Sequence, residues 1–175
     1  MTNIRQVYAI PAPYNLRSVS VAMTMLELKS LRDLRDKIGL EVAVSPWLEI
    51  TQERIDNFAE ATEDRQWIHV DVERARHESP FKATVAHGFL TASMLSRLLG
   101  SSIRFASARM GVNYGFNRLR FTDPVPAGSR IRGRFTLKAL EEIEGGVQTT
   151  WDVMVEREGS DKPCLVAEWI TRRYE

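Results

Sequence analysis

Residues 62–95 read TEDRQWIHVDVERARHESPFKATVAHGFLTASML, and they hold all three histidines of the chain, His69, His77 and His87. Asp64 and His69 follow the predicted end of a helix near residue 62, where the chain can bend and point both side chains at one spot. A carboxylate and an imidazole around one water can share proton transfer, and the carboxylate can also fix the imidazole tautomer. Spacing alone nevertheless favours a simpler interpretation, in which a loop Asp and a loop His are solvated surface residues.

The end of this stretch predicts a buried helix from about residue 87 to 99. Its apolar residues lie around much of the circumference, which is typical of an interior helix; they are Phe89, Leu90, Met94, Leu95, Leu98 and Leu99. Gly88 at its start permits close approach of another group, and the first N–H groups of a helix are unpaired. Those groups can stabilise developing charge on a carbonyl oxygen. Relief of crowding between helix and sheet is an equally good explanation of Gly88.

Downstream of the helix, the sequence alternates between apolar and polar residues with a period of two, which predicts strands with one buried face. The candidate strands cover residues 109–121, 131–139, 147–155 and 163–173, separated by turn sequences at 123–128, 144–146 and 158–161. Short turns favour antiparallel meander pairing. One buried helix with such a sheet predicts an α+β domain.

Upstream, residues 30–38 predict a short amphipathic helix with Leu31, Leu34 and Ile38 on one face. Residues 42–50 predict a strand in which Pro46 marks an edge or a bulge. Thr51 is the expected N-cap of a helix that ends near residue 62, and residues 64–86 are expected to be irregular. We therefore expect residues 1–29 to be an N-terminal extension of uncertain structure and residues 30–175 to be one domain.

Composition excludes several kinds of site. The 175 residues suit one domain, and a formal net charge of +1 gives no general attraction for nucleic acid or an anionic membrane. The single cysteine, Cys164, excludes a disulfide within the chain and a CxxC metal site, and the histidines lack HExxH spacing, so we expect no metal. With no apolar run long enough for a membrane span and no signal-peptide pattern, we expect a cytoplasmic protein.

The quoted stretch resembles the signature of MaoC-like dehydratases and (R)-specific enoyl-CoA hydratases. The residues that carry the resemblance keep the family's order and spacing; they are Asp64, His69, Asp71, Phe81 and Ala86-His87-Gly88. The resemblance continues through VNYGFNRLRFTDPVPAGSRIRG, residues 112–133, and is strongest with the nodulation-protein-N-like branch. It covers about residues 40–173.

This resemblance implies a hot-dog fold, in which a curved antiparallel sheet wraps around one long central helix, here about residues 87–99. It implies a homodimer that adds water to a trans-2-enoyl thioester, carried by CoA or acyl carrier protein, to give a 3-hydroxyacyl thioester with (R) specificity. No metal or redox cofactor is implied. Asp64 and His69 would hold the water and move its protons, and the backbone N–H of Gly88, beside His87, would bind the thioester oxygen.

Three further residues enter through the same resemblance. Ser93 and Ser96 fall where relatives place a polar residue facing the site. Many relatives have Asn-Pro between the two dyad residues, whereas this chain has Gln66-Trp67, and Trp67 is expected to reshape the pocket near the reacting carbons.

Two other functions remain open at this point. A hot-dog thioesterase would cut the thioester bond itself, although the Asp–His spacing followed by Ala-His-Gly argues against it. A non-catalytic acyl-CoA-binding protein would not need the dyad. The five arginines of residues 118–134 are most simply the solvated face of two strands, and one or two of them could meet the phosphates of CoA; they are Arg118, Arg120, Arg130, Arg132 and Arg134.

Overall fold

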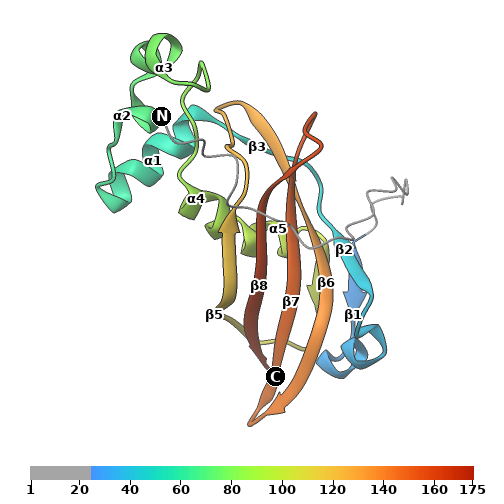
Figure 1. The fold of residues 1–175 in the computed structure, drawn as a ribbon. Coiled ribbons are helices and arrows are strands. Elements are labelled where there is room, and N and C mark those ends of the chain that lie inside the picture. The colour runs from blue at the N-terminus through green and yellow to red at the C-terminus, as the bar shows by residue number, and fades with distance from the viewer. Residues whose placement is uncertain (1–24) are drawn as a thin grey trace.

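The structure is a computed structural model that describes residues 25–175 (Figure 1). Most of the N-terminal extension expected for residues 1–29 therefore lies outside the described residues. Within residues 25–175, no helix is both long enough and apolar enough to cross a membrane.

A curved antiparallel sheet forms the main layer of the molecule. β6 (Ser129–Ile143), β7 (Gly146–Arg157) and β8 (Pro163–Tyr174) form the predicted meander, and β5 (Met110–Phe121) pairs antiparallel with β8. The strand order is β2-β6-β7-β8-β5, so within residues 25–175 β5 pairs on one side only. The α+β prediction is confirmed, together with the alternation of buried residues along β6 and β8.

The central helix lies across one face of this sheet (Figure 1). It consists of α4 (Gly88–Ser93) and α5 (Leu95–Gly100), separated by Met94. Met94 keeps helical dihedral angles of −70° and −14°, and its carbonyl accepts the N–H of Leu98 at 2.9 Å. The predicted single helix over 87–99 is thus present as two short helices that follow one another with only a local irregularity.

The core fills the space between the helix and the sheet. Leu95, Leu98 and Leu99 of α5 are about 1% exposed and belong to one cluster with Phe135 and Trp151, which are fully buried. The indole N–H of Trp151 donates to the hydroxyl of Thr149 at 2.9 Å, so the polar atom of this large buried side chain has a partner.

Two upstream predictions need correction. The predicted strand over 42–50 is two strands, β2 (Glu41–Val44) and β3 (Leu48–Ile50), and both pair with β6. Pro46 between them has no N–H, and the hydroxyl of Ser45 accepts the N–H of Gly133 at 2.9 Å. The helix predicted over 30–38 is a 3₁₀ helix, η2 (Leu31–Lys37), in which Leu31 and Leu34 are buried but Ile38 is 48% exposed.

The segment of residues 64–86 is less irregular than predicted. α1 (Gln52–Thr62) ends where expected and is capped by Thr51, whose hydroxyl accepts the N–H of Arg54 at 3.3 Å. Two short helices then follow, α2 (Trp67–Val70) and α3 (Val72–Glu78), with the Asp71 side chain capping α3. The prediction of irregular chain is wrong for these two spans.

A small parallel pair joins the start of the described chain to the end of the central helix. β1 (Leu26–Leu28) pairs in parallel with β4 (Ile103–Phe105). The last residues of the expected extension thus take part in the fold, and Leu28 is a core residue.

Candidate active site

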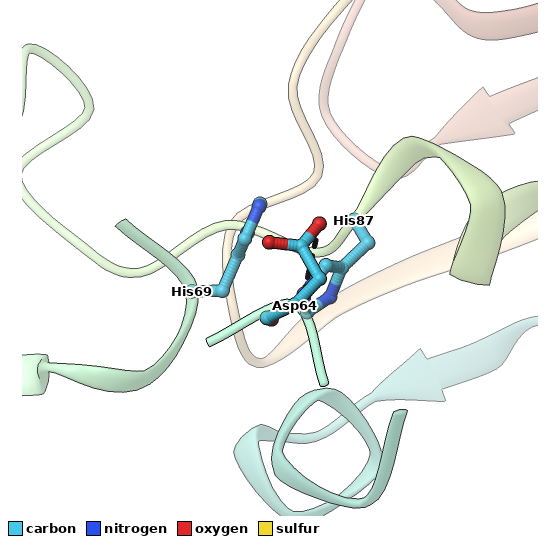
Figure 2. A group of neighbouring side chains, drawn as sticks. All are labelled: Asp64, His69 and His87. Atoms are coloured by element: carbon cyan, nitrogen blue, oxygen red, sulfur yellow. Dashed lines mark hydrogen bonds and ion pairs between the residues drawn. The ribbon is translucent and has the colours of Figure 1, made fainter. Parts of the chain in front are cut away.

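Three elements bring Asp64, His69 and His87 together (Figure 2). α1 ends at Thr62, and Glu63 after it has a left-handed backbone, with φ of 61°, that turns the chain just before Asp64. α2 carries His69, and His87 precedes the first residue of α4. The predicted meeting of Asp64 and His69 is therefore present, with His87 as a third member.

His69 is a buried imidazole with a defined tautomer. Its Nδ1 lies 2.6 Å from the carbonyl oxygen of Val85, and since a carbonyl only accepts, Nδ1 carries the proton. Nε2 is then the basic nitrogen of the neutral ring. Burial lowers the pKa of His69 below its ordinary value of 6.5, and the neighbouring His87 acts in the same direction, against the bond to Val85 and the charge of Asp64. His69 is thus a neutral proton acceptor near pH 7.

His87 supports both members of the dyad. Its Nε2 donates to the backbone carbonyl of Asp64 at 2.8 Å, and its ring stacks on His69 with centroids 3.7 Å apart. Phe58 also packs against His87, with the two ring centroids 5.0 Å apart. The Nδ1 atom of His87 is buried without a partner among the described residues. His87 thus holds the backbone of Asp64 and the ring of His69 in place through its own ring.

The Asp64 carboxylate is exposed and lies beside both imidazoles (Figure 2). Its Oδ2 is 4.0 Å from Nε2 of His87, and one ligand-type atom from each of the three residues lies within 4.8 Å of the others. Nδ1 of His69 and Nε2 of His87 are already bonded to carbonyls. Nε2 of His69, Nδ1 of His87 and the Asp64 carboxylate carry no such bond. A basic imidazole nitrogen beside a carboxylate can carry out proton transfer to and from a water.

Gly88 occupies a crowded place at the start of α4. A Cβ atom there would lie 2.6 Å from the ring of Phe121, so the position excludes a side chain unless Phe121 moves. The first bond of the helix joins the N–H of Thr91 to the carbonyl of His87 at 3.2 Å, which leaves the N–H groups of residues 88–90 without intrahelical acceptors. Close packing explains why this residue is glycine, and its N–H remains a candidate donor.

The remaining predicted residues make other contacts. The hydroxyl of Ser93 donates to the carbonyl of Phe89 at 2.7 Å, and Ser96 is bonded to Asn113 of β5 at 3.1 Å. The ring of Trp67 lies under the guanidinium of Arg74, 4.4 Å from the ring centroid. None of these contacts joins its residue to Asp64 or His69.

Gln52 is a site residue that the sequence did not indicate. Its amide nitrogen donates to the backbone carbonyl of His69 at 2.8 Å and to Asp56 at 2.7 Å, and its amide oxygen accepts from Thr84. This side chain connects the start of α1 to α2 and to the segment before His87. A polar residue in a helical first turn has no sequence signal that distinguishes such a role from ordinary surface polarity.

Three of the five arginines in the basic group pair with carboxylates of neighbouring strands or turns. Arg130 contacts Glu158 at 3.0 Å, and Arg134 contacts Glu41 at 2.7 Å. Arg132 pairs with Glu156. These three arginines lie on β6, where the expectation placed them on a strand face, and the structure adds their ion pairs. Arg118 and Arg120 of β5 are left as the candidates for contact with phosphates.

Comparisons with known proteins agree with this geometry. Residues 33–158 match the family model described as MaoC like domain. The chain is 48% identical over 145 residues to Nodulation protein N of Rhizobium leguminosarum bv. viciae, covering 81% of this chain and 89% of that protein. It is 46% identical over 149 residues to 3-hydroxyacyl-thioester dehydratase Z of Mycobacterium tuberculosis, covering 85% and 98%.

A solved structure confirms the fold. The unliganded R-hydratase PhaJ1 from Pseudomonas aeruginosa superposes with a TM-score of 0.62 at 21% identity, covering 79% of this chain and 82% of that one. The curved sheet around a central helix is therefore the predicted hot-dog fold. The family model matches most of this chain, and the two relatives are 48% and 46% identical to it. The chain therefore belongs to the family of MaoC-like domain proteins.

Proposed function

We propose that this protein is a hydratase/dehydratase that adds water to a trans-2-enoyl thioester and, in reverse, removes it from a 3-hydroxyacyl thioester. The observation that carries the proposal is the pairing of the exposed Asp64 carboxylate with a buried, neutral His69 whose Nε2 is free to accept a proton. Relatives named as a 3-hydroxyacyl-thioester dehydratase and a 3-hydroxybutyryl-CoA dehydratase support the same chemistry.

The reaction balances with groups that this site provides. A water held between Asp64 and His69 gives one proton to the dyad while its oxygen bonds to C3. The electron pair of the double bond moves through C2 to the thioester oxygen, which the N–H of Gly88 stabilises. The dyad then returns a proton to C2, so the product gains one H and one OH. The site needs no metal or redox cofactor for these steps, and we expect the rate to survive treatment with a chelator.

We further propose that the product has the (R) configuration and that the working form is a homodimer. The first proposal follows the resemblance to R-hydratases. The second is supported by β5, which has a partner strand on one side only in the described part of the chain. It exposes large apolar side chains, among them Met110, Tyr114 and Phe116. An unpaired edge with apolar side chains is a surface that a second chain can cover.

We also propose that the protein works in the cytoplasm. Its one cysteine, Cys164, is free and buried, which fits a reducing compartment.

The experiment that tests the proposed reaction incubates the protein with crotonyl-CoA and longer trans-2-enoyl-CoAs. It follows loss of the conjugated absorbance, analyses the product by chiral chromatography, and assays free thiol in parallel. We expect a 3-hydroxyacyl-CoA of one configuration, (R), without thiol release. Release of CoA from saturated acyl-CoAs would instead identify a thioesterase. Binding of acyl-CoA without either product would identify a non-catalytic protein.

A further inference from the structure

Arg173 occupies a position on β8 where the strand pattern predicts an apolar residue. The side chains of Leu165, Trp169 and Thr171 alternate along one face of β8 and are buried. Arg173 follows Thr171 at the same period-two spacing, so it lies on the core side of the sheet. Arginine is rarely placed on such a face without a charged partner.

Within the described chain, Arg173 has no carboxylate partner. Its guanidinium lies 3.9 Å from the ring centroid of Phe105, and its Nη1 donates to the hydroxyl of Thr171 at 2.7 Å. Burial alone lowers the pKa of Arg173 to about 10, so it is still cationic at pH 7. Residues 1–24 contain no Asp or Glu that could neutralise it. The adjacent Arg172 differs, since it bonds to Gln148 and stacks on Tyr114.

Arg173 also lines a pocket of about 190 Å³ between α5, β4, β5 and β8. Its lining is partly polar, with Ser96, Asn113, Thr171 and Arg173, and partly apolar, with Leu99 and Ile103 among others. At about 30 Å³ for each water, this volume holds roughly six waters or a small organic acid. A lining that combines an arginine with apolar side chains matches a ligand that has both an alkyl body and an anionic end.

We propose that this pocket binds a small aliphatic carboxylate, with its carboxylate on Arg173 and its alkyl chain against Leu99 and Ile103. The guanidinium presents several N–H donors in the planar arrangement that a carboxylate accepts. The pocket is separate from the dyad, because Ser96 and Gly100 follow His87 by nine and 13 residues. At 1.5 Å per residue, that is roughly 14–20 Å along the helix axis.

The carboxylate can come from two sources. It can be a free short-chain acid, or it can be the distal carboxylate of a long acyl chain whose thioester lies at the dyad, an alternative that rests on the proposed function. If it is a free acid, hexanoate binds without changing kcat/KM for crotonyl-CoA. If it is the acyl chain, an ω-carboxylated long-chain enoyl-CoA has a lower KM than its methyl-ended counterpart, and Arg173→Met abolishes that difference.

Calorimetric titration of the full chain with hexanoate, and with uncharged hexanol, tests the site. We expect hexanoate to bind, hexanol to bind much more weakly, and Arg173→Met to weaken hexanoate binding by roughly tenfold or more. Arg172→Met is the matched control, and binding to it should stay within about twofold of wild type. Calorimetric binding of hexanoate needs no catalytic activity. A failure to bind hexanoate can therefore be told apart from a failure of the proposed hydration reaction.

A second variant, Gly111→Leu, tests the pocket independently in case Arg173→Met does not fold. A Cβ at Gly111 would lie 4.0 Å from Cγ of Arg173, which is ordinary contact, so Gly111→Leu should fill the pocket and weaken hexanoate binding with Arg173 intact. The proposal is overturned if wild type does not bind hexanoate, or if the Arg173 and Arg172 variants lose affinity equally. It is also overturned if Arg173→Met dissociates an oligomer, because a carboxylate of a second copy would then be the partner.

Discussion

His69 is buried in its neutral form, and this gives the catalytic rate a defined dependence on pH. Its folded pKa lies below 6.5 because burial disfavours the charged ring. The rate should therefore stay constant as pH falls to 6.5, and the acidic limb of kcat/KM should lie lower. Steady-state kinetics on crotonyl-CoA across pH 4.5–8.5, at constant ionic strength, measure the limb. An acidic limb centred above 6.5 would contradict the assignment of His69 as the neutral acceptor.

The same shift affects stability with a fixed sign. The unfolded chain binds the His69 proton more readily than the folded chain does, so this residue's contribution is fully present above pH 6.5. The free energy of unfolding should fall as pH drops from 6.5 towards the folded pKa. In His69→Gln, this dependence of the free energy of unfolding on pH should be missing. Urea titrations of both proteins at several pH values will measure it.

His87 should affect the rate through Asp64 without touching the reacting atoms. His87→Phe keeps an aromatic ring against His69 and Phe58 but removes the bond to the Asp64 carbonyl. Loss of one hydrogen bond of about 1 kcal/mol predicts roughly a fivefold lower kcat with little change in KM. Kinetics with a thermal-melting control distinguish the outcomes. A rise in KM with unchanged kcat would instead show that the His87 ring contacts the substrate.

At the start of α4, Gly88 and Phe121 compete for one space. Gly88→Ala places a Cβ within 2.6 Å of the Phe121 ring, so we expect a loss of about 1–3 kcal/mol in the free energy of unfolding. The double variant Gly88→Ala/Phe121→Ala removes the clash. Gly88→Ala should therefore cost less stability when it is made in Phe121→Ala than when it is made in the wild type. Urea denaturation of the four proteins measures the coupling. Additive effects of the two changes would show that the contact is not the cause.

Some elements were predictable from sequence because their signals are local. The strands β6 and β8 alternate with a period of two, and α1 has a capping Thr51 and apolar residues at helical spacing. The helices α2 and α3 were missed because four and seven residues are too few to show a period. The β1–β4 pair joins residues that are 77 apart in register, such as Leu26 and Ile103, and only tertiary structure brings them together.

For the candidate site, the sequence predicted which residues meet but only part of how they meet. The pairing of Asp64 with His69 follows from a motif with fixed spacing. The bond from His69 to the Val85 carbonyl, the stacking of His87 and the role of Gln52 depend on main-chain positions set by three separate elements. Backbone acceptors have no residue type that a sequence motif can reveal.

The whole molecule should form a dimer of about 40 kDa, twice the 20.0 kDa chain. Phe116 on β5, the edge strand of the described sheet, is 40% exposed, and a lysine there should oppose edge pairing. We expect sedimentation equilibrium to give a dimer for wild type and a monomer for Phe116→Lys. Ile38→Lys, at a 48% exposed apolar residue far from β5 in sequence, is the control and should stay dimeric. A monomeric wild type would refute the proposed dimer. Dissociation of the dimer by both lysine variants would refute the placement of the interface at β5.

The most direct measurement of the central claim is the hydration rate of crotonyl-CoA by wild type, Asp64→Asn and His69→Gln, with His77→Gln as control. His77 is an exposed histidine of α3 that has no part in the cluster. We predict that each dyad variant loses about a hundredfold or more in kcat while keeping the wild-type melting behaviour above pH 6.5, and that His77→Gln stays within about twofold. An active wild type whose Asp64 and His69 variants hydrate at nearly the same rate would contradict the account.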